Sequence, residues 1–246
     1  MFIYIKERCR SLHRKCVINK VSLKGGFYFE ISFRNTATKR KIAKAIQICD
    51  KSEKLPIVCD NIPLNMREQR RRLDPQPFNL FLLINAFCHI IKGCDRALII
   101  DRNGMLSKHL EKPLKSVRTL YVLTKATASY EGVCEHLLSR LGVSPVIIES
   151  VSPYFPFPAV FAPFGTDEMC KTPDNCIMLG KGGFGLCCDE VFLGRKRFPY
   201  SIAAAIHLCI GTKESKNALP CFLEKQDRKY SPDGLRAKIK SSERLP

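Results

Sequence analysis

The sequence has no tryptophan and no long apolar run. The longest apolar stretch, residues 78–91, is shorter than the roughly 18 residues that a membrane-spanning helix needs, and it contains two asparagines and a histidine. We therefore expect a buried helix there and no transmembrane segment. Charge begins at Lys6 with no apolar region behind it, so the layout of a signal peptide is missing. These absences predict a soluble, cytoplasmic protein.

The motifs of common hydrolases and metalloenzymes are also missing. There is no G-x-S-x-G, H-E-x-x-H or G-x-x-x-x-G-K-[ST] string, and the 5 histidines form no pattern with a nucleophile. The 13 cysteines include no C-x-x-C pair, and most lie within apolar runs. Such cysteines are typical of a reducing compartment, where they pack as small core residues. The sequence predicts no metal centre and leaves open whether the protein is an enzyme.

Positive charge is the main excess of this sequence. There are 41 Lys and Arg residues against 23 acidic ones, which gives a formal net charge of +18. Basic clusters occur at residues 39–44, at residues 67–72 in a segment predicted to be an exposed helix, and after residue 222. Such a balance favours anionic partners. A non-enzymatic nucleic-acid-binding or regulatory protein is therefore one hypothesis, and a merely solvated basic surface is the simpler alternative.

Residues 1–95 predict a small N-terminal α/β lobe. The β-rich residues 16–23 and 27–33 flank two glycines and are typical of a hairpin. Apolar residues at helical spacing follow, from Ile42 to Cys49, with lysines and arginine on the remaining faces. Pro77 then suits the first turn of a buried helix that ends near Gly93.

Residues 96–222 predict a Rossmann-like half with a mostly parallel sheet flanked by helices. Short continuous apolar runs are typical of strands buried on both faces, and five occur, at residues 97–101, 119–124, 144–150, 159–164 and 175–179. Between the second and third lies the clearest helix, with an apolar stripe from Tyr130 to Leu141 and Gly142 as its end. This strand, helix and strand form a βαβ unit. Residues 223–246 are basic and poor in large apolar residues, and we predict a mobile tail.

The string LGKGGFG, residues 179–185, fits the G-x-G-x-x-G pattern twice. It resembles the glycine-rich loop of protein kinases, but no H-R-D or D-F-G motif follows and only 61 residues remain. It also follows an apparent strand, as a dinucleotide-binding turn does, although no acidic residue lies about 20 residues further on. Three interpretations stay open: a dinucleotide fingerprint, a turn that needs positive φ, and a ligand-binding loop at a strand end.

Polar residues after the expected strands predict a ligand site, because ligands of parallel sheets bind at the carboxyl edge. Asp101 is placed to meet a ribose or a metal ion, or to bond its own turn. Hydroxyls near residue 127 suit an anion or cap a helix. The predicted cofactor-binding residues are Asp101, Thr124, Thr127, Ser129, Gly165, Gly180, Lys181, Gly182 and Gly185. The leading prediction is therefore a protein that binds a nucleotide, such as NAD(P), or another phosphate metabolite, with undetermined activity and oligomeric state.

Overall fold

The computed structural model describes residues 1–7, 16–23, 25–33, 39–52, 54–59, 62, 64–151, 157–166, 176–187 and 189–242. The chain divides into two compact units, each assembled from two stretches of sequence. Unit 1 consists of residues 1–78 and 191–218, and unit 2 consists of residues 79–190 and 219–246. This division differs from the boundaries expected after residues 95 and 222, because residues 191–218 pack with the N-terminal lobe although they follow the parallel sheet in the chain.

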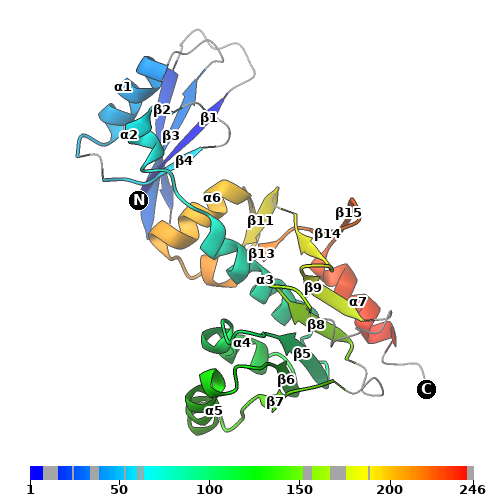
Figure 1. The fold of residues 1–246 in the computed structure, drawn as a ribbon. Helices are drawn as coiled ribbons and strands as arrows, with labels where there is room; N and C mark the ends of the chain where they lie inside the picture. Colours follow the sequence, from blue (N-terminus) through cyan, green and yellow to red (C-terminus); the bar gives the residue numbers. More distant parts are fainter. Residues whose placement is uncertain are drawn as a thin grey trace. The chain divides into compact units, whose positions relative to one another are not determined.

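Unit 1 is built on a four-stranded mixed sheet with the order β2-β3-β1-β4 (Figure 1). β2 (Cys16–Leu23) and β3 (Gly26–Phe33) form the predicted antiparallel hairpin, which is confirmed. β1 (Phe2–Glu7) pairs in parallel with both β3 and β4 (Ile57–Cys59). β1 has no counterpart among the predicted strands, yet it occupies a central position because its apolar residues are buried.

The helix α1 (Lys39–Cys49) covers one face of this sheet. Ile42, Ala45 and Ile46 are buried at the predicted helical spacing. They belong to one core cluster with residues of all four strands. The sequence offers Asn35 or Thr36 as the cap of this helix, and both lie outside the described residues.

A single turn of helix, α2 (Met66–Gln69), follows β4. Its start is a capping box, because the Asn65 side chain accepts from the Glu68 backbone N–H at 3.0 Å and the Glu68 carboxylate accepts from the Asn65 N–H at 3.1 Å. The basic segment at residues 67–72 is therefore helical only over its first residues, and part of it has a structural role described below.

The second stretch of unit 1 adds a hairpin and a helix. β11 (Glu190–Leu193) and β12 (Lys196–Pro199) are neighbours in one sheet, and the helix α6 (Tyr200–Ala205) continues as one π-helical turn, η2 (Ile206–Ile210). A short 3₁₀ turn, η3 (Ser215–Asn217), follows. The apolar run at residues 201–210 predicts a buried helix. Residues 202–206 are buried as expected, whereas residues 207–210 are only partly buried or exposed. A Cβ added to Gly26 would lie 3.3 Å from the side chain of Ile210, so this stretch packs on the N-terminal hairpin.

Unit 2 is built on a five-stranded sheet in which every pairing is parallel. The strand order is β7-β6-β5-β8-β9 (Figure 1). The strands are β5 (Arg96–Ile100), β6 (Thr119–Leu123), β7 (Val146–Ile148), β8 (Ala159–Ala162) and β9 (Ile177–Gly180). All five coincide with the predicted apolar runs. A mixed α/β fold with a parallel sheet flanked by helices is therefore confirmed.

The two faces of this sheet are covered differently. One face packs against the largest core cluster, to which α3 (Gln76–Ile90), α4 (Glu111–Leu114), α5 (Ala128–Leu141) and α7 (Pro232–Ser242) all contribute. There, Phe87 of α3 stacks on Phe161 of β8 with 5.1 Å between ring centroids. On the opposite face, sheet residues pack with Phe157, and no described helix joins that cluster. None of the described helices is long and apolar enough to cross a membrane.

The C-terminal segment differs from the basic tail expected from its composition. β14 (Leu223–Lys225) and β15 (Arg228–Tyr230) form a hairpin, which β10 (Gly185–Leu186) extends to three antiparallel strands, after a two-residue strand β13 (Leu219–Pro220). Leu235 and Ile239 of α7 are then buried in the core. Two apolar residues four apart are enough to anchor a short helix whose other faces are charged, so composition alone did not reveal it.

Candidate functional site

Asp101, at the carboxyl end of β5, is buried with 1% of its surface exposed. Its carboxylate accepts hydrogen bonds from the backbone N–H groups of Met105 at 3.1 Å and Leu106 at 2.6 Å, and from the hydroxyl of Tyr130 on α5. Burial, together with the Asp101 carboxylate, raises the pKa of Tyr130 above its ordinary value. In this arrangement Asp101 ties the loop after β5 to α5, instead of presenting its carboxylate to solvent, where a ribose would meet it.

The hydroxyls predicted near the start of α5 lie beside the same loop. The Thr124 hydroxyl accepts a hydrogen bond from the Ala126 N–H at 3.0 Å. Thr127 occupies the N-cap position of α5, but its side chain makes no capping bond to the described residues of this helix. Ser129 lies against Gly104, where an added Cβ would be 2.6 Å from the Cβ of Ser129. The loop after β5 therefore packs directly on the first turn of α5, and the glycine, with φ of +71°, makes this close approach sterically possible.

The LGKGGFG turn bonds to the protein's own backbone. Four of its amides donate to carbonyl oxygens: Gly180 to Phe184 at 2.9 Å, Lys181 to Ala162 at 3.1 Å, Gly183 to Gly180 at 3.0 Å and Phe184 to Met178 at 2.8 Å. In a phosphate-binding turn, such N–H groups point at the ligand and a helix follows. Here the amides are occupied, and the strand β10 follows instead of a helix.

The glycines of this turn are explained by close backbone packing. A Cβ on Gly180 would lie 2.2 Å from the Ala162 carbonyl oxygen, and one on Gly183 would lie 2.2 Å from the Met178 carbonyl oxygen. Gly180 and Gly182 also have φ of +118° and +86°. These observations favour the interpretation in which the glycines serve the turn itself.

The structure brings the predicted residues together in two groups at the carboxyl edge of the sheet. Asp101, Thr124, Thr127 and Ser129 surround the loop after β5. The second group follows β8 and β9, where a Cβ on Gly165 would lie 3.4 Å from the Lys181 side chain. Gly185 belongs to β10, beyond both groups.

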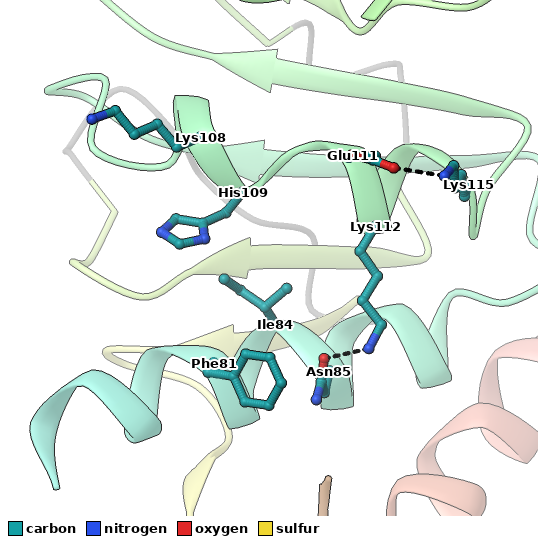
Figure 2. Close-up of a pocket in the computed structure, with 8 residues that line it drawn as sticks. All are labelled: Phe81, Ile84, Asn85, Lys108, His109, Glu111, Lys112 and Lys115. Carbon is teal, nitrogen blue, oxygen red and sulfur yellow. Dashed lines mark hydrogen bonds and ion pairs between the residues drawn. The ribbon is translucent and has the colours of Figure 1, made fainter. Parts of the chain in front are cut away.

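A pocket of about 330 Å³ lies on the helical face of unit 2, and the sequence did not predict it (Figure 2). It opens between α3 and the segment formed by η1 (Ser107–His109) and α4. The lining residues are Phe81, Ile84, Asn85, Lys108, His109, Glu111, Lys112 and Lys115. Apolar groups form most of the wall, and basic side chains surround them.

Lys112 reaches from α4 to α3 across this pocket (Figure 2). Its Nζ donates to the Asn85 Oδ1 at 2.6 Å and lies 5.9 Å from the centroid of the Phe81 ring. Asn85 is only 2% exposed. Burial lowers the pKa of Lys112, because desolvation disfavours the charged form. An anion in the pocket would offset this desolvation by direct attraction.

The acid among the lining residues is already paired. Glu111 accepts from Lys115 at 2.6 Å and from Arg140 at 2.9 Å. The bond from Lys115, with the nearby Arg140, holds the pKa of Glu111 below its ordinary value. Glu111 is thus paired with Lys115 and Arg140. Lys108, His109 and Lys112 are the other ionisable side chains of the lining.

A sequence signal for this pocket exists at helical spacing. Lys108, Lys112 and Lys115 recur at intervals of four and three residues, and Phe81 and Asn85 are four apart on α3. Phe81 and Asn85 therefore lie on one face of α3, whereas Lys108 belongs to η1 and Lys112 to α4. That these segments meet depends on how α3 and α4 pack on the sheet, which the sequence does not show.

Among the residues that the structure describes, no group of three His, Cys, Asp or Glu side chains is placed to hold a metal ion. No protein-family model matches this chain, and no curated protein matches it significantly. The function is therefore inferred from the residues and their geometry alone.

Proposed function

We propose that the protein binds a small phosphate-bearing ligand, a nucleotide or a phosphate metabolite, in the pocket between α3 and α4. The main support is a cavity of about 330 Å³ whose lining includes Lys108, His109 and Lys112. This volume lies within the usual range of small-molecule pockets, which is roughly 300–1,000 Å³. The basic groups suit the phosphate, and the Phe81 ring with Ile84 suits the apolar or aromatic part of the ligand.

We also propose that unit 2 is a Rossmann-like half. Numbered along the chain, its parallel strands have the order 3-2-1-4-5, which is the order of dinucleotide-binding sheets without their sixth strand. In such sheets the ligand binds at the carboxyl edge where the strand order reverses, here between β5 and β8. Exposed cations follow three of the strands, namely Arg102, Lys125 and Lys181. This edge is the alternative location for the same ligand, NAD(P) included.

A ligand panel tests the proposal. ATP, AMP, NAD(P) and S-adenosylmethionine are added to the full chain at millimolar concentration, and thermal unfolding is followed. A ligand at 100 times its Kd stabilises the folded state by about 2.7 kcal/mol. We expect at least one phosphate-bearing member to do so. If none stabilises the protein, the proposal fails.

Paired variants then locate the site. Lys112→Met removes the pocket's central charge, and Lys181→Met removes one charge from the carboxyl edge. We expect Lys112→Met to weaken binding at least tenfold, which corresponds to about 1.4 kcal/mol, and Lys181→Met to leave it unchanged. The reverse result would place the ligand at the carboxyl edge.

The lowered pKa of Lys112 gives a pH test of the same site. Lys112 loses its proton at a lower pH than an ordinary lysine, so affinity for the ligand should fall as pH rises through this lowered pKa. The Lys112→Arg variant, whose guanidinium stays protonated, should hold its own affinity over the same range. A wild-type affinity that stays constant from pH 8 to pH 10.5 would contradict the role of Lys112.

A further inference from the structure

The net charge of this protein is concentrated in unit 1. Residues 1–78 and 191–218 contain 23 Lys and Arg residues and 8 Asp and Glu residues, a net charge of +15. Residues 79–190 and 219–246 contain 18 and 15, a net charge of +3. Unit 1 therefore holds most of the excess, although it is the smaller part of the chain.

The helix α1 presents this charge to solvent. Its apolar residues are buried against the sheet, so the opposite side faces outward. Lys39, Arg40, Lys41 and Lys44 are all exposed. Side chains three or four apart on a helix have Cβ atoms about 5–6 Å apart, so these cations form one dense group.

Two acids of the same region are buried. Asp50, at the end of α1, is 6% exposed, and it accepts from the Arg71 guanidinium and from the Leu55 N–H, each at 2.7 Å. Glu68 is 8% exposed and accepts from the Asn65 N–H in the capping box. Both carboxylates thus accept hydrogen bonds within the fold of unit 1.

Arg71 also fixes α2 relative to α1. Besides Asp50, its guanidinium binds the Leu55 carbonyl oxygen through two donors, at 2.8 and 3.2 Å. The exposed Arg67 and Arg70 therefore belong to a segment that a buried ion pair ties to the C-terminal end of α1. We use the name basic face for Lys39, Arg40, Lys41, Lys44, Arg67 and Arg70.

We propose that the basic face of unit 1 binds the phosphate backbone of nucleic acid without reading its sequence. Cations held on fixed elements release the counterions condensed on the phosphates, which is the main source of sequence-independent affinity. The helices α1 and α2 contain no aromatic residue for base stacking, so contacts to the backbone are the mode that this surface supports. This proposal does not depend on the small ligand of unit 2.

An anionic membrane would attract the same charges. However, a helix that binds lipid inserts its apolar face into the bilayer, whereas the apolar face of α1 is buried in the core of unit 1. Only Ile48 and Met66 expose large apolar side chains among the described residues of α1 and α2, at 62% and 73%. The observations therefore favour nucleic acid, and lipid vesicles serve as the competing arm of the test.

The experiment measures binding of the full chain to a labelled 30-base-pair DNA duplex of mixed sequence between 50 and 300 mM salt. The test variant is Arg40→Gln/Lys41→Gln/Lys44→Gln. The matched control is Arg195→Gln/Lys196→Gln/Lys213→Gln, which removes the same charge from exposed residues of the same unit. Circular dichroism and thermal unfolding confirm that both variants fold.

We expect the wild type to bind with a steep salt dependence, and the test variant to bind at least tenfold more weakly at 100 mM salt. Each lost phosphate contact lowers the slope of log K against log salt by about 1, so the test variant should lose about 3 and the control less than 1. Equal losses in both variants overturn the assignment to the basic face. Absence of duplex binding at 50 mM salt, or binding to phosphatidylserine vesicles but not to the duplex, overturns the proposal itself.

Discussion

The two units of this chain differ in which charged side chains are exposed and which are buried. In unit 1 the acids Asp50 and Glu68 are buried and bonded while the lysines of α1 face solvent. In unit 2 the totals nearly balance, and a lysine, Lys112, is drawn into a pocket against Asn85. A whole-chain charge of +18 therefore describes neither surface. The charge of the surface of unit 1 follows from its composition and from the burial of two of its acids.

Both units also bury one carboxylate to organise a loop, but they satisfy it differently. Asp50 is held by a cation, Arg71, at 2.7 Å. Asp101 is held by neutral donors, namely two backbone N–H groups and the Tyr130 hydroxyl. In the first arrangement a full positive charge adds to the neutral donors Ser52 and Leu55, whereas in the second the negative charge is shared among neutral dipoles. Removing one donor should therefore cost more in unit 1 than in unit 2.

The largest effect is expected in unit 1, from Arg71→Met. This variant leaves the buried Asp50 without its cation, and breaking such a pair typically costs about 3–5 kcal/mol. Urea unfolding measures the loss, and hydrogen exchange shows whether it falls in unit 1. The exposed neighbour Arg70→Met is the control, with an expected change within about 0.5 kcal/mol. Equal losses in the two variants would remove the basis for a structural Arg71.

In unit 2 the next largest effect is expected from Gly183→Ala. The new Cβ would lie 2.2 Å from the Met178 carbonyl oxygen, so backbone must move. Overpacking of this kind costs about 3 kcal/mol. Gly132→Ala is the control, because it lies within α5 with nothing within 4 Å of an added Cβ, and it should be neutral or stabilising by up to about 1 kcal/mol. If Gly183→Ala unfolds like the wild type, the turn is not rigid.

A smaller loss in unit 2 is expected from Tyr130→Phe. Removing a hydrogen bond to a buried carboxylate costs about 2 kcal/mol. Because the folded state raises the pKa of Tyr130, the folded state holds its proton at pH values where the unfolded state loses it. This contribution to stability is complete below the unfolded pKa of about 10 and is lost as pH rises further. Unfolding free energies should therefore converge for the two proteins above pH 10, and a constant difference would contradict the bond.

The smallest effect is expected from salt. Like charges in unit 1 repel one another, and salt screens exposed charges more than about 10 Å apart at 0.1 M. Raising NaCl from 20 to 300 mM should increase the opening free energy of amides in unit 1 by about 1 kcal/mol, and by less in unit 2. Hydrogen exchange resolves the two units in one sample. A similar gain in both would show that the charge difference has no effect on stability.

Local patterns predicted most individual elements correctly. The five strands of unit 2 follow from apolar runs, and the helices α1, α3 and α5 follow from helical spacing. Each of these patterns spans about 15 residues or fewer. The division into units was not predicted, because it depends on residues 191–218 returning to the N-terminal sheet. The strand β1 was missed because its apolar run was weighed only as a targeting signal.

The candidate site was predicted less well, for a similar reason. The glycines from Gly180 to Gly183 form a motif in sequence, yet their amides bond to Ala162 and Met178, which a motif search does not include. The pocket residues Phe81 and Lys112 form no motif, and they meet only because two helices pack on one sheet face. The role of the glycine turn and the existence of the pocket both depend on contacts between segments that are far apart in sequence.

The interrupted layout of unit 1 sets the order in which the protein is completed during synthesis. The ring of Phe78 contacts those of Tyr200 and His207, with centroids 5.9 and 5.2 Å away. Tyr200 and His207 are synthesised only after all five strands of the parallel sheet. Residues 1–78 therefore keep part of their apolar surface uncovered until residues 191–218 have been synthesised.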